Sequence, residues 1–389
     1  MRNNLHALRM GLLSSGLMLA LDGGAQAAKF TVLHSFVGGS LDGASPFGGV
    51  TPASRGDFYV ATDGGGSSNK GTLALVNTKN GLAQVLHTFT GGSDGQNADG
   101  TPIVWSIDGA VYGTTQFGGS KGCGTIYKYT PGSGAYQQLT AFGCTPAPAF
   151  PFAGLVADSA ANALFGVGYN GGPDDDGEAF YVDSDGSTGS SCYFDSRYGT
   201  HPFAAVTPLN ESLFAATTTG GANDLGAIMD VCSFTVLHSF AGGSDGATPY
   251  GTLLYYNGAL YGTTSNGGAG GNLGTVFRIS PDGSNYTVLH SFLGICCGNS
   301  DGSFPRSGLT LNPKDGELYG TTINGGGSSD LGTVFKIDAR SGKEKVVHAF
   351  SGGDGAHPYG NLYIEMGKIY GTTLAGGSNN LGVVFKLKS

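Results

Sequence analysis

Short runs of alternating apolar and polar residues dominate the chain, and each run ends at Gly, Asn, Asp or Pro. Residues 251–292 show the pattern well, with the runs GTLLYYN, ALYGTT, GTVFRIS and YTVLHSF. Val, Leu, Tyr, Phe and Thr favour strands, whereas Asn, Asp and Gly tolerate the positive φ of tight turns. No helical period is sustained after residue 29. The pattern therefore predicts an all-β protein of short antiparallel strands.

Three phrases recur along the chain in a constant order. The second position of the phrase LYGTT is aromatic in seven copies, which are spaced 47 to 58 residues apart: Tyr59, Tyr112, Phe165, Phe214, Tyr261, Tyr319 and Tyr370. The phrase LHSF supplies His34, His87, His238, His290 and His348, and the third and fourth copies lack this histidine. The phrase GTVFK begins at Gly71, Gly124, Gly177, Gly226, Gly274, Gly332 and Gly382. Four strands per copy are typical of the blade of a β-propeller, so we predict a single seven-bladed β-propeller of four-stranded blades.

The two ends of the repeated region complement each other. A strand-type segment, FTVLHSF at residues 30–36, precedes the first full copy, and the last copy stops after GVVFKL at residues 382–387. We therefore expect the N-terminal strand to complete the last blade, which would cover two sheet edges and close the ring.

The first 27 residues differ from the repeats. Arg2 and Arg9 flank the start of an apolar run, GLLSSGLMLAL, and Ala25-Gln26-Ala27 fits a signal-peptidase site. The apolar run is too short to span a bilayer. We expect residues 1–27 to be a Sec-type signal peptide cleaved after Ala27, residues 28–389 to form the propeller, and the product to be secreted or periplasmic.

The composition narrows the classes of partner. The chain has a net charge of −9, and charged residues make up only 12% of it. An acidic, weakly charged protein is a poor candidate for nucleic-acid binding. We expect no membrane span after signal removal, no cofactor and a monomer.

The six cysteines all follow the predicted signal peptide. Export permits disulfides. We predict the pairs Cys123–Cys144 and Cys192–Cys232, each between adjacent blades, with Cys296 and Cys297 left as a vicinal pair, although six cysteines allow 15 connectivities.

The repeat unit LHSFxGGxDGxxPxxxLxxxxGxLYGTTxxGGxxxxGTVFK resembles that of bacterial choice-of-anchor tandem repeat GloVer-containing proteins, and the resemblance covers residues 30–388. It implies an extracellular protein and supplies no catalytic residue. Many such proteins carry a C-terminal surface anchor, whereas this chain ends at Lys388-Ser389, so we expect a soluble form.

The repeated polar residues are predicted to be framework. We expect the LHSF histidines to make one internal hydrogen bond per blade, with the Thr pair of YGTT as the candidate partner. The Asp of the GGSDG loop recurs as Asp42, Asp94, Asp245, Asp301 and Asp354. A turn role is favoured for it over a calcium site, because the alternate carboxylates of a calcium loop are missing. We predict no metal site.

Candidate binding residues lie where the copies differ. Strand alternation puts the two long loops of every blade on one face of the disc, where binding residues usually collect. The residue after the recurrent proline forms an aromatic column, in which Asp99 and Arg306 are the charged exceptions. The predicted ligand-binding residues are Arg197, Tyr198, His201, Arg306, His357 and Asp99.

Two functions fit these residues. The first is a secreted binding or structural module that binds a carbohydrate or a small polar ligand through its loop-rich face. The alternative is a polysaccharide-active enzyme at the central channel. A uronate lyase would use Arg to neutralise the carboxylate and Tyr or His to move protons, whereas a glycoside hydrolase would use two carboxylates, for which Asp99 and residues 174–178 are candidates. No GxSxG or HExxH motif is present.

Overall fold

The structure is a computed structural model that describes residues 29–158, 160–183, 185–295 and 301–388. The predicted signal peptide, residues 1–27, and the predicted vicinal pair Cys296–Cys297 lie outside the described residues.

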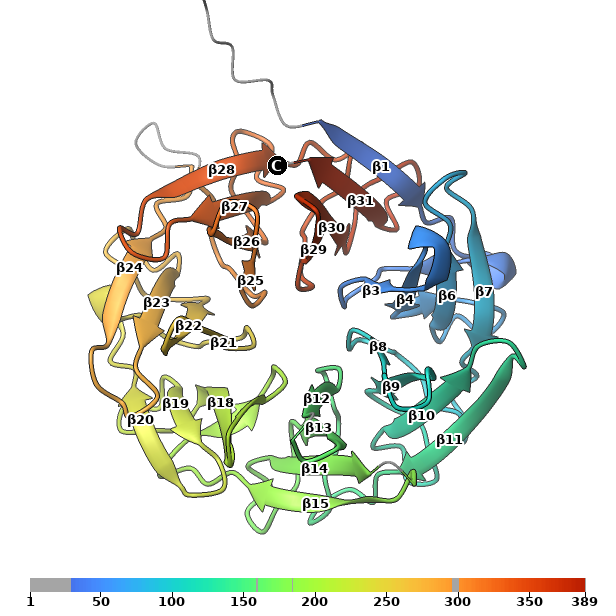
Figure 1. Ribbon diagram of the computed structural model, residues 1–389, viewed down its shortest axis with the longest axis horizontal. Helices are drawn as coiled ribbons and strands as arrows, with labels where there is room; N and C mark the ends of the chain where they lie inside the picture. The colour runs from blue at the N-terminus through green and yellow to red at the C-terminus, as the bar shows by residue number, and fades with distance from the viewer. Residues whose placement is uncertain (1–28, 159, 184, 296–300, 389) are drawn as a thin grey trace, which may run out of the picture.

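Seven antiparallel sheets form a ring, each with four strands in meander order (Figure 1). This confirms the predicted seven-bladed β-propeller. The blades are, in chain order, β3 (Thr51–Pro52), β4 (Phe58–Thr62), β6 (Thr72–Val76) and β7 (Ala83–Thr88); β8 (Ile103–Val104), β9 (Val111–Thr115), β10 (Thr125–Thr130) and β11 (Ala135–Ala141); β12 (Val156–Asp158), β13 (Ala163–Gly168), β14 (Glu178–Asp183) and β15 (Thr188–Tyr193); β17 (Thr207–Leu209), β18 (Ser212–Thr219), β19 (Ala227–Asp230) and β20 (Thr235–Ser239); β21 (Leu254–Tyr256), β22 (Ala259–Thr264), β23 (Thr275–Ile279) and β24 (Thr287–Ser291); β25 (Thr310–Leu311), β26 (Leu318–Thr322), β27 (Thr333–Ile337) and β28 (Glu344–Ala349); and β29 (Tyr363–Glu365), β30 (Lys368–Thr373), β31 (Val383–Lys388) and β1 (Phe30–Ser35).

A few short elements lie outside this pattern. In blade 4, β16 (Thr200–Pro202) pairs with the end of β18. The strands β2 (Gly43–Ala44) and β5 (Gly64–Gly65) pair with each other, and the described part of the chain includes the 3-10 turns η1 (Gly39–Leu41), η2 (Ser54–Gly56) and η3 (Gly243–Asp245).

The N-terminal strand closes the ring as expected. β1 pairs antiparallel with β31, from Phe30 opposite Leu387 to Ser35 opposite Val383. The two strands lie side by side at the top of Figure 1, although more than 340 residues separate them. Because β1 is the outermost strand of blade 7, the blade gains its fourth strand and the outer edge of β31 is covered.

The core lies between blades, which explains why the unit is repeated. Phe214 and Ile228 of blade 4 pack with Leu260 and Phe277 of blade 5, and all four side chains are at most 4% exposed. A single twisted sheet cannot bury both of its faces, whereas each sheet of a closed ring is covered on both sides.

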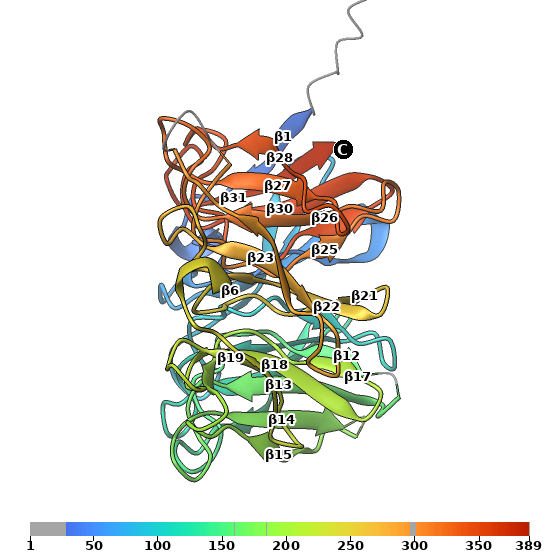
Figure 2. The ribbon, with the colours of Figure 1, turned by 90° about the vertical axis from the view of Figure 1, so that its left-hand side faces the viewer.

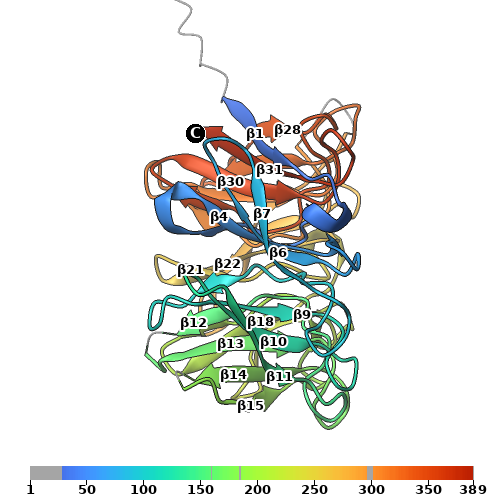
Figure 3. The same cartoon turned by 90° about the vertical axis from the view of Figure 1, so that its right-hand side faces the viewer.

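Both long loops of each blade lie on one face of the disc. The loop that enters blade 5 and the loop between β22 and β23 are joined by backbone hydrogen bonds in both directions between Ala247 and Asn266, at 2.9 and 3.0 Å. The short turns between first and second strands lie on the other face, because the strands alternate in direction. Figures 2 and 3 show the disc edge-on. We refer to the two sides as the loop face and the turn face. Within the described residues, no helix is long and apolar enough to cross a membrane.

Candidate functional site

The residue that follows the recurrent proline, which is replaced by Ala98 in blade 2, points into the central channel in every blade. These seven residues line one cavity of about 500 Å³ and are Phe47, Asp99, Phe152, Phe203, Tyr250, Arg306 and Tyr359. The predicted aromatic column with two charged exceptions is therefore the lining of the channel.

Aromatic rings meet across the channel axis. The ring of Phe203, from blade 4, lies 4.4 Å from that of Phe152, 5.0 Å from that of Tyr250 and 6.1 Å from that of Tyr359. Phe47 lies 3.9 Å from Tyr359 and 6.3 Å from Phe203. These contacts narrow the channel at its loop-face end.

The cavity lies beyond these rings, on the side of the turn face. In each blade its lining begins at the residue after the proline and continues along the first strand, for example through Gly360 to Tyr363 in blade 7 and through Gly100 to Val104 in blade 2. Within the described chain, the lining includes the last residues of the loops that enter the blades and no residue of the loops between second and third strands. We predicted a binding site on the loop-rich face, whereas the cavity extends from the aromatic rings toward the turn face.

Arg306 is the single arginine in the lining. Its guanidinium carbon lies 4.5 Å from the ring centre of Tyr250 and 5.6 Å from that of Tyr359. One terminal nitrogen donates to the Tyr359 hydroxyl at 3.5 Å, and Nε is buried without a hydrogen-bond partner among the described residues. Because cations over aromatic faces are attracted by the ring quadrupole, the two tyrosines hold the guanidinium in place without neutralising it.

Asp99 does not act as the counter-ion of Arg306. Its side chain is 5% exposed, and Oδ1 has no hydrogen-bond partner within the described residues. Burial, and then the neighbouring Asp63, hold the pKa of Asp99 well above its usual range. Asp63 is itself fixed by a hydrogen bond from the Asn97 amide. A neutral carboxyl group is therefore favoured at this position.

The two predicted histidines lie outside the cavity lining. His201 hydrogen-bonds through Nδ1 with the hydroxyls of Thr200 and Thr219, and its ring lies 4.8 Å from that of Tyr169. His357 bonds through Nδ1 with the carbonyl oxygen of Ile323. Both side chains hold neighbouring loops together at the loop face.

Arg197 and Tyr198 lie further from the channel. Arg197 forms a two-nitrogen ion pair with Asp195, the closer contact being 2.5 Å, and its side chain is 73% exposed. Tyr198 packs beside Phe234, which lies in the turn between β19 and β20 on the outer side of blade 4. Of the six predicted residues, the structure brings only Asp99 and Arg306 into one cavity.

The repeated histidines pair with the repeated aspartates. Nε2 of His34, His87, His238, His290 and His348 lies 3.0 to 3.2 Å from the Asp of the following loop. The prediction of an internal hydrogen bond is confirmed, but its partner was wrong. The second Thr of YGTT instead bonds to the Thr of GTVFK on the neighbouring strand, as Thr264 does with Thr275 at 2.8 Å. The same Asp residues accept backbone N–H groups, as Asp245 does from Ala241 at 2.7 Å, which confirms their turn role.

Both predicted disulfides are present. Cys192–Cys232 joins β15 of blade 3 to the turn before β20 of blade 4, as expected. Cys123–Cys144 joins the loop between β9 and β10 of blade 2 to the loop that leads from β11 into blade 3.

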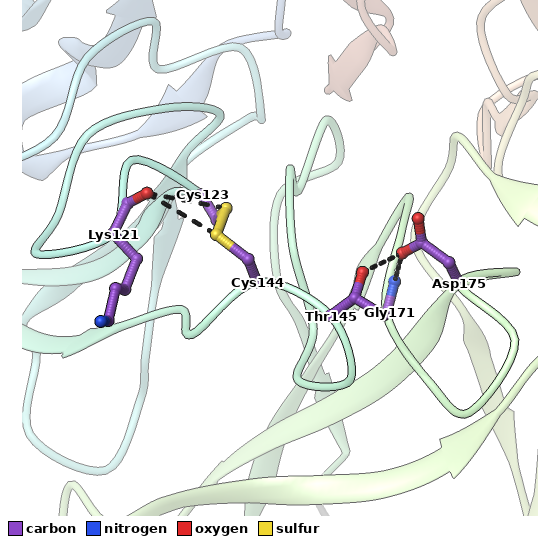
Figure 4. Close-up of a disulfide and its surroundings, with 6 residues drawn as sticks. All are labelled: Lys121, Cys123, Cys144, Thr145, Gly171 and Asp175. Atoms are coloured by element: carbon purple, nitrogen blue, oxygen red, sulfur yellow. Dashed lines mark hydrogen bonds between the residues drawn. A yellow bond between two sulfur atoms is a disulfide. The ribbon is translucent and has the colours of Figure 1, made fainter.

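The acidic loop of blade 3 has a structural role next to the first disulfide (Figure 4). Asp175 accepts hydrogen bonds from the Thr145 hydroxyl and, at 3.0 Å, from the Gly171 N–H. Asp176 accepts the Ser196 N–H at 2.8 Å. These carboxylates therefore brace loops and do not face the channel cavity.

Sequence reasoning missed the orientation of the cavity and the pairing of Asp99 with Asp63. An indication was available, because the first strands carry small residues after the aromatic position, such as Gly100 and Gly360, which leave space along the channel.

Residues 14–229 and 192–385 match the profile of the Gloeobacter/Verrucomicrobia repeat. No curated protein matches the sequence. The fold is similar to the extracellular domain assigned to a hybrid two-component system of B. thetaiotaomicron, with 12% identity and a TM-score of 0.57. The match covers 93% of this chain and 40% of that one. It is also similar to an oligogalacturonate lyase solved in complex with manganese, with 10% identity and a TM-score of 0.56 over 93% of this chain and 96% of that one. At these identities the likeness concerns the fold alone.

Proposed function

The chain belongs to the Gloeobacter/Verrucomicrobia repeat family, and on this basis we propose that it is an exported binding module whose channel cavity holds an acidic carbohydrate. One observation carries the proposal. Arg306 presents a cation to a cavity of about 500 Å³, and none of the ion pairs within the described residues includes it. Arg306 is half-buried, and a charge that is partly removed from water favours a partner of opposite sign, so the cavity favours a ligand that brings a carboxylate.

The other lining residues suit a sugar. Phe47, Phe152 and Phe203 offer aromatic faces, and Tyr250 and Tyr359 add hydroxyl groups beside the guanidinium. Binding sites for small molecules commonly combine an apolar, aromatic lining with a few oriented polar groups. The planar guanidinium can donate two parallel hydrogen bonds to a carboxylate, which selects uronic acids over neutral sugars.

Export is part of the proposal. It is supported by the signal-like residues 1–27, by the two disulfides and by the similarity to an extracellular domain. Disulfides persist mainly in oxidising compartments.

Binding is favoured over elimination by the protonation state of the cavity. Burial raises the pKa of Tyr359 to about 12, although Arg306 acts in the opposite direction. A phenol with such a pKa stays protonated near neutral pH and is a poor general base. The lining contains no histidine among the described residues.

Isothermal titration calorimetry of the purified protein tests the proposal. The ligands are oligosaccharide pairs that differ only at C6, which carries either a carboxylate or a hydroxymethyl group. We expect the acidic member to bind, and Arg306→Met to weaken its binding by roughly 10-fold or more, as expected for the loss of a charge-assisted hydrogen bond.

Arg340→Met is the matched control, because Arg340 is exposed in the turn between β27 and β28, and its binding should equal that of the wild type. Equal binding of both oligosaccharides, or of neither, contradicts the proposal. New ultraviolet absorbance from an unsaturated uronate would replace binding by β-elimination as the function.

A further inference from the structure

Three junctions between outer strands share one contact, which the junction of blades 5 and 6 lacks. The LHSF histidine stacks on an aromatic ring at the start of the next blade's outer strand: His87 on Tyr136 at 3.7 Å, His238 on Tyr286 at 3.7 Å and His348 on Phe30 at 3.9 Å. In the outer strand of blade 6, the position equivalent to these rings is occupied by Glu344, which lies beside His290 of blade 5. A carboxylate thus replaces a ring beside a histidine.

This replacement brings three metal-ligating side chains together. His290 Nε2 lies 3.0 Å from Asp301 Oδ2, and one ligand atom each from His290, Asp301 and Glu344 lies within 4.8 Å of the others. All three side chains are half-buried. Asp301 is oriented by the Leu293 N–H at 3.1 Å.

The carboxyl group of Glu344 is incompletely paired within the described residues. Its Oε1 is buried and has no hydrogen-bond partner among the described residues. Two neighbouring carboxylates in a half-buried site require a proton or a cation between them.

We propose that His290, Asp301 and Glu344 bind one divalent transition-metal ion, such as Zn²⁺, at the outer edge of the junction between blades 5 and 6. The imidazole favours a transition metal over Ca²⁺ and Mg²⁺, which take oxygen ligands. Bonds of about 2 Å require ligand atoms roughly 3 to 4 Å apart, so only a small movement of Glu344 completes the set. Three protein ligands leave a position for water.

The site does not depend on the channel cavity, because none of its residues lines the channel. Failure of either proposal therefore leaves the other unaffected. The pairs of His87, His238 and His348 with their aspartates provide internal controls, since they have the same two ligands with an aromatic ring in the third place.

Equilibrium dialysis of the metal-free full chain against Zn²⁺ tests the site, with Co²⁺ absorption in the visible range as a second readout. We expect one tightly bound ion, with affinity reduced at least 10-fold in Glu344→Tyr, since loss of even an outer ligand partner typically costs that much. Glu344→Tyr restores the aromatic residue of the other junctions, so it should fold. His238→Asn, at the junction of blades 4 and 5, should leave Zn²⁺ binding unchanged.

Cys296 and Cys297 lie in the same connection, between His290 and Asp301 in sequence, and thiolates also bind zinc. The dialysis is therefore repeated in a Cys296→Ser, Cys297→Ser background, where binding should persist. The proposal is overturned if the double variant loses the ion, if Glu344→Tyr retains it, or if the wild type binds none and the two carboxyl groups share a proton instead.

Discussion

One residue in every blade adopts the same uncommon backbone conformation immediately before the recurrent proline, which is replaced by Ala98 in blade 2. Ser45, Asn97, Phe150, His201, Thr248, Phe304 and His357 all have φ between 53° and 57°. Asn and His are enriched in this region, whereas Ser, Thr and Phe rarely adopt it. Each donates its backbone N–H to a carbonyl oxygen of the preceding blade, as Thr248 does to Leu225 at 2.8 Å. A tertiary hydrogen bond thus overrides a local preference, and the turn directs the residue two positions later into the channel.

Glu344 leads to a prediction about pH. The pKa of its carboxyl group rises from 4.5 to about 8 on folding, through burial and the proximity of Asp301. Between these values the folded protein holds a proton that the unfolded chain has released, so stability falls as pH rises through this window. With a chelator present, the free energy of unfolding of wild type relative to Glu344→Gln should decrease between about pH 5 and pH 9. Urea titrations across this range measure it, and parallel profiles would contradict the assignment.

At the scale of the strands, the repeated phrases are cross-strand pairs. The Gly of LYGTT lies opposite the aromatic residue of GTVFK, as Gly262 does opposite Phe277. This glycine lies inside β22 and leaves room for the ring. The composition of these strands was readable from the sequence. The role of this glycine in making room for Phe277 could not be read from the sequence, because it depends on where the neighbouring ring packs.

Gly262→Ala should therefore be destabilising. A Cβ at this position would lie 2.5 Å from Phe277 Cζ and 2.9 Å from Leu253 Cδ2. Both neighbours are at most 4% exposed and cannot move freely. Overpacking of this kind costs about 1–3 kcal/mol.

Chemical denaturation compares this variant with Gly353→Ala, since a Cβ at Gly353 would meet nothing within 4 Å. The control should stay within roughly 0.5 kcal/mol of the wild type. Equal stability of the two variants would show that the blade core repacks around an added methyl group.

For the whole molecule, stability depends on ring closure. β1 is contributed by the first described residues and β31 by the last, and together they bring Leu33 and Val384 into one core cluster with Phe58 of blade 1. Leu33 is 8% exposed and Val384 is fully buried. The contact between the ends of the chain therefore completes two blade interfaces and one sheet.

Removal of residues 28–35 should lower the thermal midpoint and promote self-association. The outer edge of β31 would then expose unpaired N–H and C=O groups, which attract other strands. Thermal unfolding and size-exclusion chromatography measure the two effects, and a synthetic peptide of residues 28–36 should restore both. An unchanged midpoint in the shortened chain would contradict closure by β1.

The sequence alone was sufficient to derive seven blades, the closing strand and the channel-facing column that contains Asp99 and Arg306. These features follow from alternation, repeat spacing and turn chemistry, which are local properties of the chain. The partner of each repeated histidine, the direction of the cavity and the separation of Arg197 and Tyr198 from Arg306 were decided only by the tertiary structure. They depend on how the blades are tilted and packed against one another, and such contacts between distant residues leave no signature in the local pattern.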